Sequence, residues 1–509
     1  MMKYDVLVEP WIPVLMLSGE RKKLGLLDVL RQAHLILKID GLNVMEEFSV
    51  YRFLILFVLS VYRPVYSDDI SDIYDDECFD MDKVADYVSL CRREGVTFDI
   101  FDDQRPFLQS PYDSKLDEGN IKPISVLDKT MPSGNNPIHF VPVLQEDSVM
   151  TCDKAIRCLL SIYIFGLFGT GGYPFNINRI PPVYFLPKGK NLFSTLVLSL
   201  YPLGSLADDS DPLKLEIWRN PMVVCKDEKV VSVSPLYGMI FPCRRVTLIK
   251  EENSSVLRNC YFQPGLNFVN KNSGWRDSYV VYFHNHKNDV ISLTPSIDKE
   301  MWRNIGTVYG MFYDSAINKK ILSVVGQFKK ILSDFDETKL TLMTFGVVVA
   351  HGKVIYYDLQ RGELSLDSRI ADVVEKVQLV LNALAKLESV GGCLDKHIKE
   401  LSKSLFGRDI CCSGVREQVL HNFYGVCESD FYVFCDKLAV VENSDADRQN
   451  CLDFWLEKIR NNVLDSYDMY CDIVCSTSKY LMKGVNQKIY FLAGVNKIIK
   501  IERSKPENA

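Results

Sequence analysis

From residue 367 to its end, the chain carries successive long segments in which apolar residues recur at helical spacing. There are four of them: Arg369–Glu388 (continued by His397–Leu405 after a Gly391-Gly392 break), Val415–Leu438, Asp447–Val474 and Ser478–Ile501. Amphipathic helices joined by short links bury their apolar faces against one another. Residues 367–509 are therefore predicted to form an antiparallel four-helix bundle.

Residues 1–366 instead alternate between short strand-like runs and helical segments, which predicts a large mixed α/β domain. The spacing predicts helices over Glu46–Val61 and Val149–Phe168, and an acidic solvated loop over Asp68–Glu77. Leu340–Val349 and Val354–Asp358 read as the two strands of a hairpin. The whole chain is thus expected to be an α+β protein with two domains, 1–366 and 367–509.

Composition narrows the class of function. The net charge of −7 argues against a protein that coats nucleic acid without specificity. It is compatible with a subunit that touches DNA through a few loops while basic partners neutralise most phosphates. The apolar run Phe53–Tyr62 is shorter than the roughly 20 residues that span a bilayer. Acidic Asp5 and Glu9 do not suit a signal peptide, so a cytoplasmic protein is expected.

No motif points to catalysis. The sequence has no H-E-x-x-H, P-loop or G-x-S-x-G pattern, and its 15 cysteines include no C-x-x-C pair. The cysteines are interpreted as reduced core residues, and neither a metal nor a cofactor is expected. Asp445 and Asp447 read as helix-start residues rather than as a nuclease centre.

Five short patterns occur in a fixed order between Glu9 and Gly172. They are Glu9-Pro10-Trp11-Ile12-Pro13-Val14, Phe98–Asp102, Arg105–Gln109, Pro132–Pro137 and Gly169–Gly172. Together they resemble the large subunit of type I-E CRISPR Cascade complexes, the CasA family. The resemblance implies a non-catalytic subunit of an RNA-guided surveillance complex. Such a subunit recognises the protospacer-adjacent motif (PAM) in double-stranded DNA, helps to open the duplex, stabilises the R-loop and recruits a helicase–nuclease.

The cluster Gly169-Thr170-Gly171-Gly172 has two interpretations. It is typical of a helix end followed by a turn, because glycine is favoured there. Glycines also let a backbone approach a base edge or an anion without a clash at Cβ. The resemblance implies the second role, with the cluster in the minor groove of the PAM duplex.

The resemblance also assigns roles to the predicted hairpin tip and to a lysine. Without it, Ala350-His351-Gly352-Lys353 would be an ordinary surface turn. The resemblance makes this tip a wedge beneath the PAM, although the family often has Gln or Asn where this chain has His351, Gly352 and Lys353. Lys271 is the candidate for a lysine finger on the PAM duplex, with Lys250 as runner-up; a lone lysine otherwise merely aids solubility.

A further loop is expected to meet the guide RNA. Ser133-Gly134-Asn135-Asn136 is turn chemistry in any protein. The resemblance implies that it anchors the subunit to the 5′ handle of the CRISPR RNA and to the handle-binding subunit. Trp11, Arg105, Pro106 and Phe107 are interpreted as packing residues.

The remaining partners implied by the resemblance are the backbone and small subunits of the complex. The bundle would contact the small subunits and the displaced DNA strand. Basic residues of the last helix could bind that strand, or could simply form a solvated face: Lys479, Lys483, Lys488, Lys497, Lys500 and Arg503. Two other classes stay open: a stand-alone hydrolase with an α/β core and helical cap, and a scaffold that binds only proteins.

Overall fold

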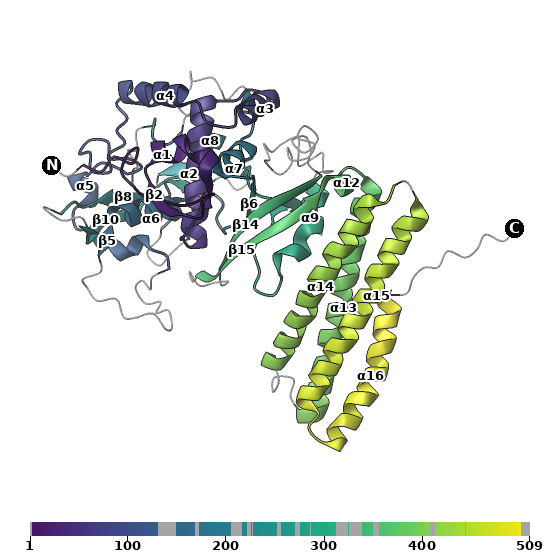
Figure 1. Cartoon of the computed structure of the whole chain (residues 1–509). Helices are drawn as coiled ribbons and strands as arrows, with labels where there is room; N and C mark the ends of the chain where they lie inside the picture. Colours follow the sequence, from purple (N-terminus) through teal and green to yellow (C-terminus); the bar gives the residue numbers. More distant parts are fainter. Residues whose placement is uncertain are drawn as a thin grey trace. The chain divides into compact units, whose positions relative to one another are not determined.

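The computed structural model describes most of the chain (Figure 1). The described residues are 3–130, 149–167, 173–204, 216–220, 225, 228–251, 256–269, 275–285, 287–311, 324, 338–349, 356–407, 413–442 and 444–499. The chain divides into two compact units, one of residues 1–301 and 314–365 and one of residues 302–313 and 366–509. The division predicted after residue 366 placed residues 302–313 in the first domain, whereas they belong to the second unit.

The first unit is built around one buried helix. Helix α2 (Val44–Tyr62) begins at Asn43, whose side chain accepts a hydrogen bond from the backbone N–H of Glu46. Every residue from Met45 to Ser60 is buried, so the apolar run seen in the sequence is a core helix. It contacts α4 (Met81–Arg93), α6 (Cys152–Phe165), α7 (Leu192–Leu198) and α8 (Pro235–Met239).

The first unit also contains small sheets, two of which contact α2 through β3 and β14. The first has the order β2-β1-β3, formed by Arg21–Leu24, Ile12–Met16 and Ile36–Ile39, with α1 (Leu26–Arg31) and the 3-10 turn η1 (Ala33–Leu35) between β2 and β3. The second has the order β4-β10-β8, formed by Ile121–Pro123, Asn259–Pro264 and Arg244–Leu248. The third has the order β15-β14-β6, formed by Tyr356–Asp367, Lys339–Val349 and Tyr184–Pro187.

The described part of the first unit also contains three two-stranded pairs and short helical segments. The pairs are β5–β9 (Met150–Thr151 with Val256–Leu257), β7–β11 (Lys229–Val230 with Asn267–Phe268) and β12–β13 (Tyr282–His284 with Val290–Ser292). The helical segments are α3 (Ser67–Asp75), α5 (Ser114–Asp117) and η2 (Ile124–Leu127).

Two predictions about this unit need comment. The strands expected on either side of residues 350–353 are present as neighbours in one sheet, but β15 continues to Asp367, well beyond the predicted Asp358. The acidic loop predicted over Asp68–Glu77 was wrong, because helix α3 forms there. The Asp69 carboxylate caps the start of α3 by accepting from the backbone N–H groups of Val65 and Tyr66, while Ile70 and Ile73 are buried.

The second unit contains the predicted bundle, and the fold class is confirmed. Helices α13 (Val374–Phe406), α14 (Ser413–Val440), α15 (Asp445–Val474) and α16 (Ser478–Ile499) run side by side (Figure 1), with α13 in contact with the other three. Short α9 (Ile305–Met311), preceded by the 3-10 turn η5 (Met301–Asn304), packs on α13, and α12 (Ser368–Ala371) precedes it. Helix α13 is long and apolar enough to cross a membrane by those two measures alone, which core helices also satisfy.

The break predicted at Gly391-Gly392 was wrong, because α13 passes through both glycines without interruption. Gly391 is buried against α14, where a Cβ atom would lie 2.1 Å from the Tyr424 hydroxyl oxygen. The Tyr424 ring is in turn covered by Arg303, whose guanidinium carbon lies 3.4 Å from the ring centroid. Glycine serves close helix packing at this position and does not end the helix.

The two glycines should therefore respond to alanine with opposite signs. Gly391→Ala forces the Tyr424 ring to move, and such overpacking should cost about 1–3 kcal/mol of unfolding free energy. Gly392 is exposed with no atom near its missing Cβ, so Gly392→Ala should stabilise by about 0.5–1 kcal/mol through helix propensity. Urea unfolding followed by circular dichroism measures both, and stabilisation by both alanines would contradict the packing role of Gly391.

Candidate nucleic-acid interface

The residues of the four predicted contact loops, unlike the alternative Lys250, lie outside the described residues. They fall in four stretches: the handle segment (131–148, with Ser133, Gly134, Asn135 and Asn136), the glycine segment (168–172, with Gly169, Thr170, Gly171 and Gly172), the lysine segment (270–274, with Lys271) and the tip segment (350–355, with Ala350, His351, Gly352 and Lys353). The described residues beside each segment define where the chain enters and leaves it.

The chain on both sides of the glycine segment is held by one buried arginine. Arg244 on β8 is 3% exposed, and its guanidinium donates to the carbonyl of Leu167 at 2.6 Å and to that of Pro174 at 2.5 Å. Asn176 adds a second tie, because its backbone N–H and its side-chain amide both donate to the Gly166 carbonyl at 2.9 Å. The entry and exit of the glycine segment are thereby fixed next to each other.

The chain beside the handle segment is held at the start of α6. Asp128 accepts hydrogen bonds from the backbone N–H and the hydroxyl of Thr130, and pairs with Lys154 on α6 at 2.6 Å. Burial acts to raise the pKa of Asp128, but the hydrogen bonds from Lys154 and Thr130 outweigh it and lower that pKa below its usual range. On the other side, β5 follows the segment and pairs with β9.

A row of cations and aromatic rings joins these two bases. The Lys129 ammonium lies 5.6 Å from the Phe262 ring centroid, and that ring lies 5.4 Å from the ring of Tyr173. The Arg244 guanidinium lies over the Tyr173 ring, 5.1 Å from its centroid, and ends the row. The residues directly before the handle segment and directly after the glycine segment therefore belong to one packed cluster.

The pH dependence of stability should report on this cluster. Burial, together with the smaller effect of the nearby Arg244 charge, lowers the pKa of Lys129 from 10.5 to about 8. Between these values the unfolded chain keeps a proton on this lysine that the folded chain has lost, so Lys129 contributes stability that rises with pH across that window, by up to about 3 kcal/mol. Lys129→Met should lose this contribution: urea unfolding at pH 7.5 and pH 10 should show a stability change that is less favourable at high pH than that of the wild type, by up to about 3 kcal/mol.

Burial raises the pKa of thiols such as Cys152 and Cys260, so they lose protons in this window only in the unfolded chain and make stability fall with pH. Both proteins share this contribution, so it cancels in the difference between them. Lys122→Met is the control, since Lys122 is exposed on the neighbouring strand β4. That variant should keep the wild-type dependence. An unchanged pH slope in Lys129→Met would contradict the assignment of the rise to Lys129.

The chain beside the lysine segment is also anchored. Before it, the backbone N–H of Val269 donates to Val230 at 3.0 Å. After it, the Trp275 indole N–H donates to the Asn178 side chain at 3.0 Å, and the ring lies where a Cβ on Gly238 would come within 2.2 Å of it. Lys250, the alternative lysine, lies over the Phe101 ring at 5.8 Å from its centroid.

A buried ion pair ties the same region to the core helix. Arg52 on α2 and Asp277 are 2% and 1% exposed, and their side chains approach to 2.8 Å. Asp277 also accepts a hydrogen bond from the Asn178 amide at 2.8 Å. The position of Asn178, and through it that of Trp275, is thus set by the centre of the first unit.

The strands beside the tip segment rest on the same helix. β14 contacts α2, and Arg361 on β15 pairs with Glu47 of α2 at 3.0 Å. Burial raises the pKa of the Glu47 carboxyl to about 7, although the Arg361 charge opposes this. The two strands form a supported frame from which the tip segment departs.

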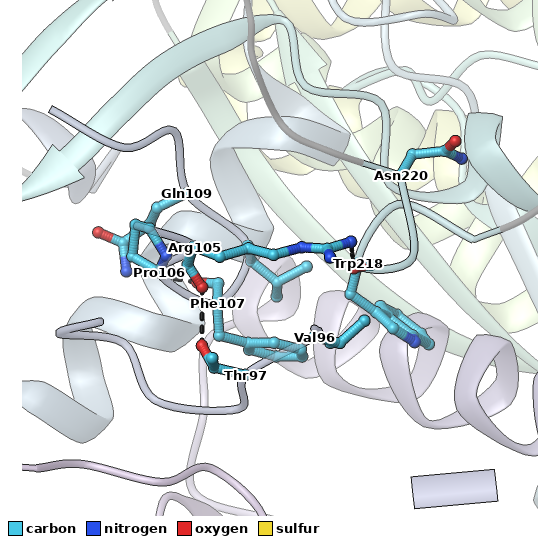
Figure 2. A pocket seen from close by; sticks show the side chains of 9 residues that line it. Val96, Thr97, Arg105, Pro106, Phe107, Gln109, Trp218 and Asn220 are labelled. Carbon is cyan, nitrogen blue, oxygen red and sulfur yellow. Dashed lines mark hydrogen bonds between the residues drawn. The ribbon is translucent and has the colours of Figure 1, made fainter. Parts of the chain in front are cut away.

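Arg105 and Phe107, interpreted as packing residues from the sequence, hold the chain around Trp218. The Arg105 guanidinium donates to the backbone carbonyls of Glu94, Trp218 and Arg219 at 2.8–3.1 Å, and Figure 2 shows the side chain extended toward Trp218. Phe107 is 3% exposed and packs on the Trp218 ring. The cavity beside them measures about 10 Å³, too small for a ligand. Trp11, also expected in the core, is fully buried.

Several described side chains bear on whether the chain has a metal site or a nuclease centre. No three His, Cys, Asp or Glu side chains there gather in a way that could hold a metal ion. Ser444 caps α15 by accepting from the N–H of Asp447, and Asp445 is solvated. Of the basic residues on α16, Lys488 pairs with Asp468 and Lys483 donates to Ser404, while Lys479 and Lys497 are exposed.

Comparisons with known proteins agree on one family. The family model of the CRISPR-associated protein Cse1 matches residues 5–466. The CRISPR-associated protein CasA/Cse1 of Thermus thermophilus is 28% identical over 425 residues, covering 80% of this chain and 79% of that protein. The solved structure of Thermus thermophilus CasA aligns with a TM-score of 0.75 at 22% identity, over 98% of this chain and 100% of that one.

A further solved chain comes from a CRISPR RNA-guided surveillance complex, with a TM-score of 0.73 and 17% identity over 96% of this chain and 100% of that one. The likeness to both structures concerns the fold, while the family model covers most of the sequence. The motifs between Glu9 and Gly172 and the architecture point the same way. The chain therefore belongs to the CRISPR-associated Cse1 family, also named CasA, the large subunit of type I-E surveillance complexes.

Proposed function

We propose that this chain is the non-catalytic subunit that recognises the PAM in double-stranded DNA and helps to open the duplex. The observation that carries the proposal is the anchoring of the glycine segment by Arg244. Because Leu167 and Pro174 bind the same guanidinium, the segment leaves and rejoins the body at one point. A short glycine-rich stretch held in this way suits a backbone probe that enters a minor groove. There the amino group of guanine is the main feature that distinguishes G·C from A·T pairs.

The other segments complete this proposal. Lys271 would reach a phosphate of the PAM duplex, and Ala350–Lys353 would act as the wedge beneath it, with His351 stacking on a base. Ser133–Asn136 would hold the 5′ handle of the CRISPR RNA. The Lys129–Phe262–Tyr173–Arg244 cluster lies beside both the handle segment and the glycine segment. This supports the proposal that the handle contact and the PAM contact start from one packed region of the unit.

Partners follow from the same proposal. The chain would work in the cytoplasm with the handle-binding, backbone and small subunits, stabilise the R-loop and recruit a helicase–nuclease. The bundle presents exposed apolar residues along α16 that suit contact with another subunit: Leu481, Met482, Val485, Ile489 and Tyr490. A stand-alone hydrolase is not favoured, because the family match covers most of the chain.

The test is binding of a reconstituted RNA-guided complex, with and without this chain, to target duplexes that carry a randomised PAM. We expect PAM selectivity only with the chain, and a loss on the order of tenfold in Gly171→Asp, since a carboxylate in the groove repels phosphates and bases. Shortening the Ala350–Lys353 tip should also weaken PAM selectivity. Ser18→Asp adds the same charge at an exposed turn and should have no effect. Equal selectivity with and without the chain would overturn the PAM role and favour a protein-only scaffold.

A further inference from the structure

A cavity of about 250 Å³ lies in the first unit, between described residues that follow the glycine segment and those that flank the lysine segment. Asn178 and Arg179 line one side, Phe268, Trp275 and Arg276 another, and Tyr282 on β12 a third. Ligand sites usually measure roughly 300–1,000 Å³. This cavity is therefore suited to a ligand of about one aromatic ring system with a small appendage.

The lining selects for an anion that carries a ring. It includes two guanidinium groups and no carboxylate among the described residues. Arg276 lies 5.2 Å from the Tyr282 ring centroid and Arg179 lies 5.7 Å from that of Phe175. A guanidinium group can donate to two oxygens of one phosphate, and an aromatic face can stack on a base.

The walls of the cavity are fixed before any ligand arrives. Trp275 is held by the Asn178 side-chain oxygen, while the Asn178 amide donates to Asp277 and to the Tyr184 hydroxyl at 2.8 and 3.1 Å. Such preorganisation lowers the entropy cost of binding.

The backbone of Arg179 is held as well. Its φ of +64° is a left-handed conformation that is uncommon for a residue with a side chain. Asn176 maintains it by accepting from the Arg179 N–H at 3.0 Å and donating to the Arg179 carbonyl at 3.1 Å. Asn176 also binds Gly166 at the base of the glycine segment, so one residue connects the cavity wall to that base.

We propose that this cavity takes one unpaired nucleotide of the opened target duplex, with its base against Trp275 and Tyr282 and its phosphate between Arg179 and Arg276. The proposal rests on the proposed function, because the nucleotide must come from a duplex that the chain has helped to open. A free mononucleotide offers the same chemistry, so the experiment has to separate the two sources.

The experiment scans single abasic sites through both strands next to the PAM and measures the affinity of the whole complex for each target. If the cavity holds a base, one position should lose about tenfold in affinity when that base is removed, the usual size of one stacked base. The same removal should cost less than about twofold in Arg276→Ala, because the site has already lost its phosphate contact. Arg21→Ala, an exposed arginine on β2, is the control and should retain the tenfold effect.

Arg179 is exposed, so Arg179→Ala provides a second variant that keeps the fold if Arg276→Ala does not. An equal abasic cost in the wild type and in the variants, or a flat scan in the wild type, would overturn the proposal. Titration of the isolated chain with dAMP, dCMP, dGMP and dTMP tests the other source: saturation below about 1 mM together with a flat scan assigns the cavity to free nucleotides instead. PAM selectivity measured on the same complexes separates the two proposals. Its absence would overturn the proposed function, whereas its presence with a flat abasic scan would overturn only the assignment of the cavity.

Discussion

Replacing Arg52 with alanine should lower the free energy of unfolding by about 3–5 kcal/mol, because it leaves the buried Asp277 carboxylate without its cation. The guanidinium also donates to the Met239 carbonyl at 2.6 Å and lies within 6 Å of the Phe48 and Tyr184 ring centroids, at 5.8 and 5.6 Å. Alanine removes these contacts together and opens a cavity beside α2. Urea unfolding of the isolated chain measures the loss.

An exposed ion pair provides the control. Arg21 pairs with Asp40 at 2.7 Å, but the Arg21 side chain is 77% exposed, so Arg21→Ala should cost at most about 1 kcal/mol. Adding Asp277→Asn to Arg52→Ala should recover part of the loss, since the amide keeps the hydrogen-bonding shape without the buried charge. Equal losses in Arg52→Ala and Arg21→Ala, or no recovery in the double variant, would contradict the importance of the buried pair.

Replacing Arg244 with methionine should weaken discrimination of the preferred PAM on the order of tenfold, because the chain on both sides of the glycine segment loses its shared donor. Methionine keeps the volume of the side chain but leaves the Leu167 and Pro174 carbonyls without a partner, at about 1–3 kcal/mol for each buried group. The measurement compares the affinity of the complex for the preferred PAM with that for a scrambled one.

The neighbouring arginine separates this effect from general loss of stability. Arg245 is equally buried on β8, but its guanidinium pairs with Asp117 at 2.8 Å and donates to the Pro111 carbonyl at 2.6 Å. Arg245→Met should destabilise the chain at least as much and leave PAM discrimination in the folded complex unchanged. If Arg245→Met reduced discrimination as much as Arg244→Met, the role of Arg244 as a specific anchor would be wrong.

The predicted architecture of the bundle was close to the observed one. Helices α14, α15 and α16 begin and end within two residues of the predicted bounds, because their apolar spacing is a local property of the sequence. The prediction failed at Gly391-Gly392, where glycine was interpreted as a break. Gly391 makes room for Tyr424, which lies on another helix, and this contact cannot be inferred from the residues next to Gly391 in the sequence.

The same difference applies to the candidate interface. Ordered motifs identified the family and named four segments, but none of them indicated the residues that anchor those segments. Arg244 reaches carbonyls 77 and 70 residues away, and Arg52 reaches one 187 residues away. Lys129, Phe262 and Tyr173 meet without any regular spacing in the sequence.

The sequence by itself therefore determined the family, the α+β class and the last three long helices, because motif order and apolar periodicity are local properties of neighbouring residues. Only the tertiary structure decided which of its arginines are buried anchors and which are solvated. Arg52, Arg244 and Arg21 look alike in the sequence, yet Arg52 and Arg244 are buried and Arg21 is 77% exposed. We expect their contributions to stability to differ severalfold, because a buried charge has lost its water and needs a partner from elsewhere in the chain.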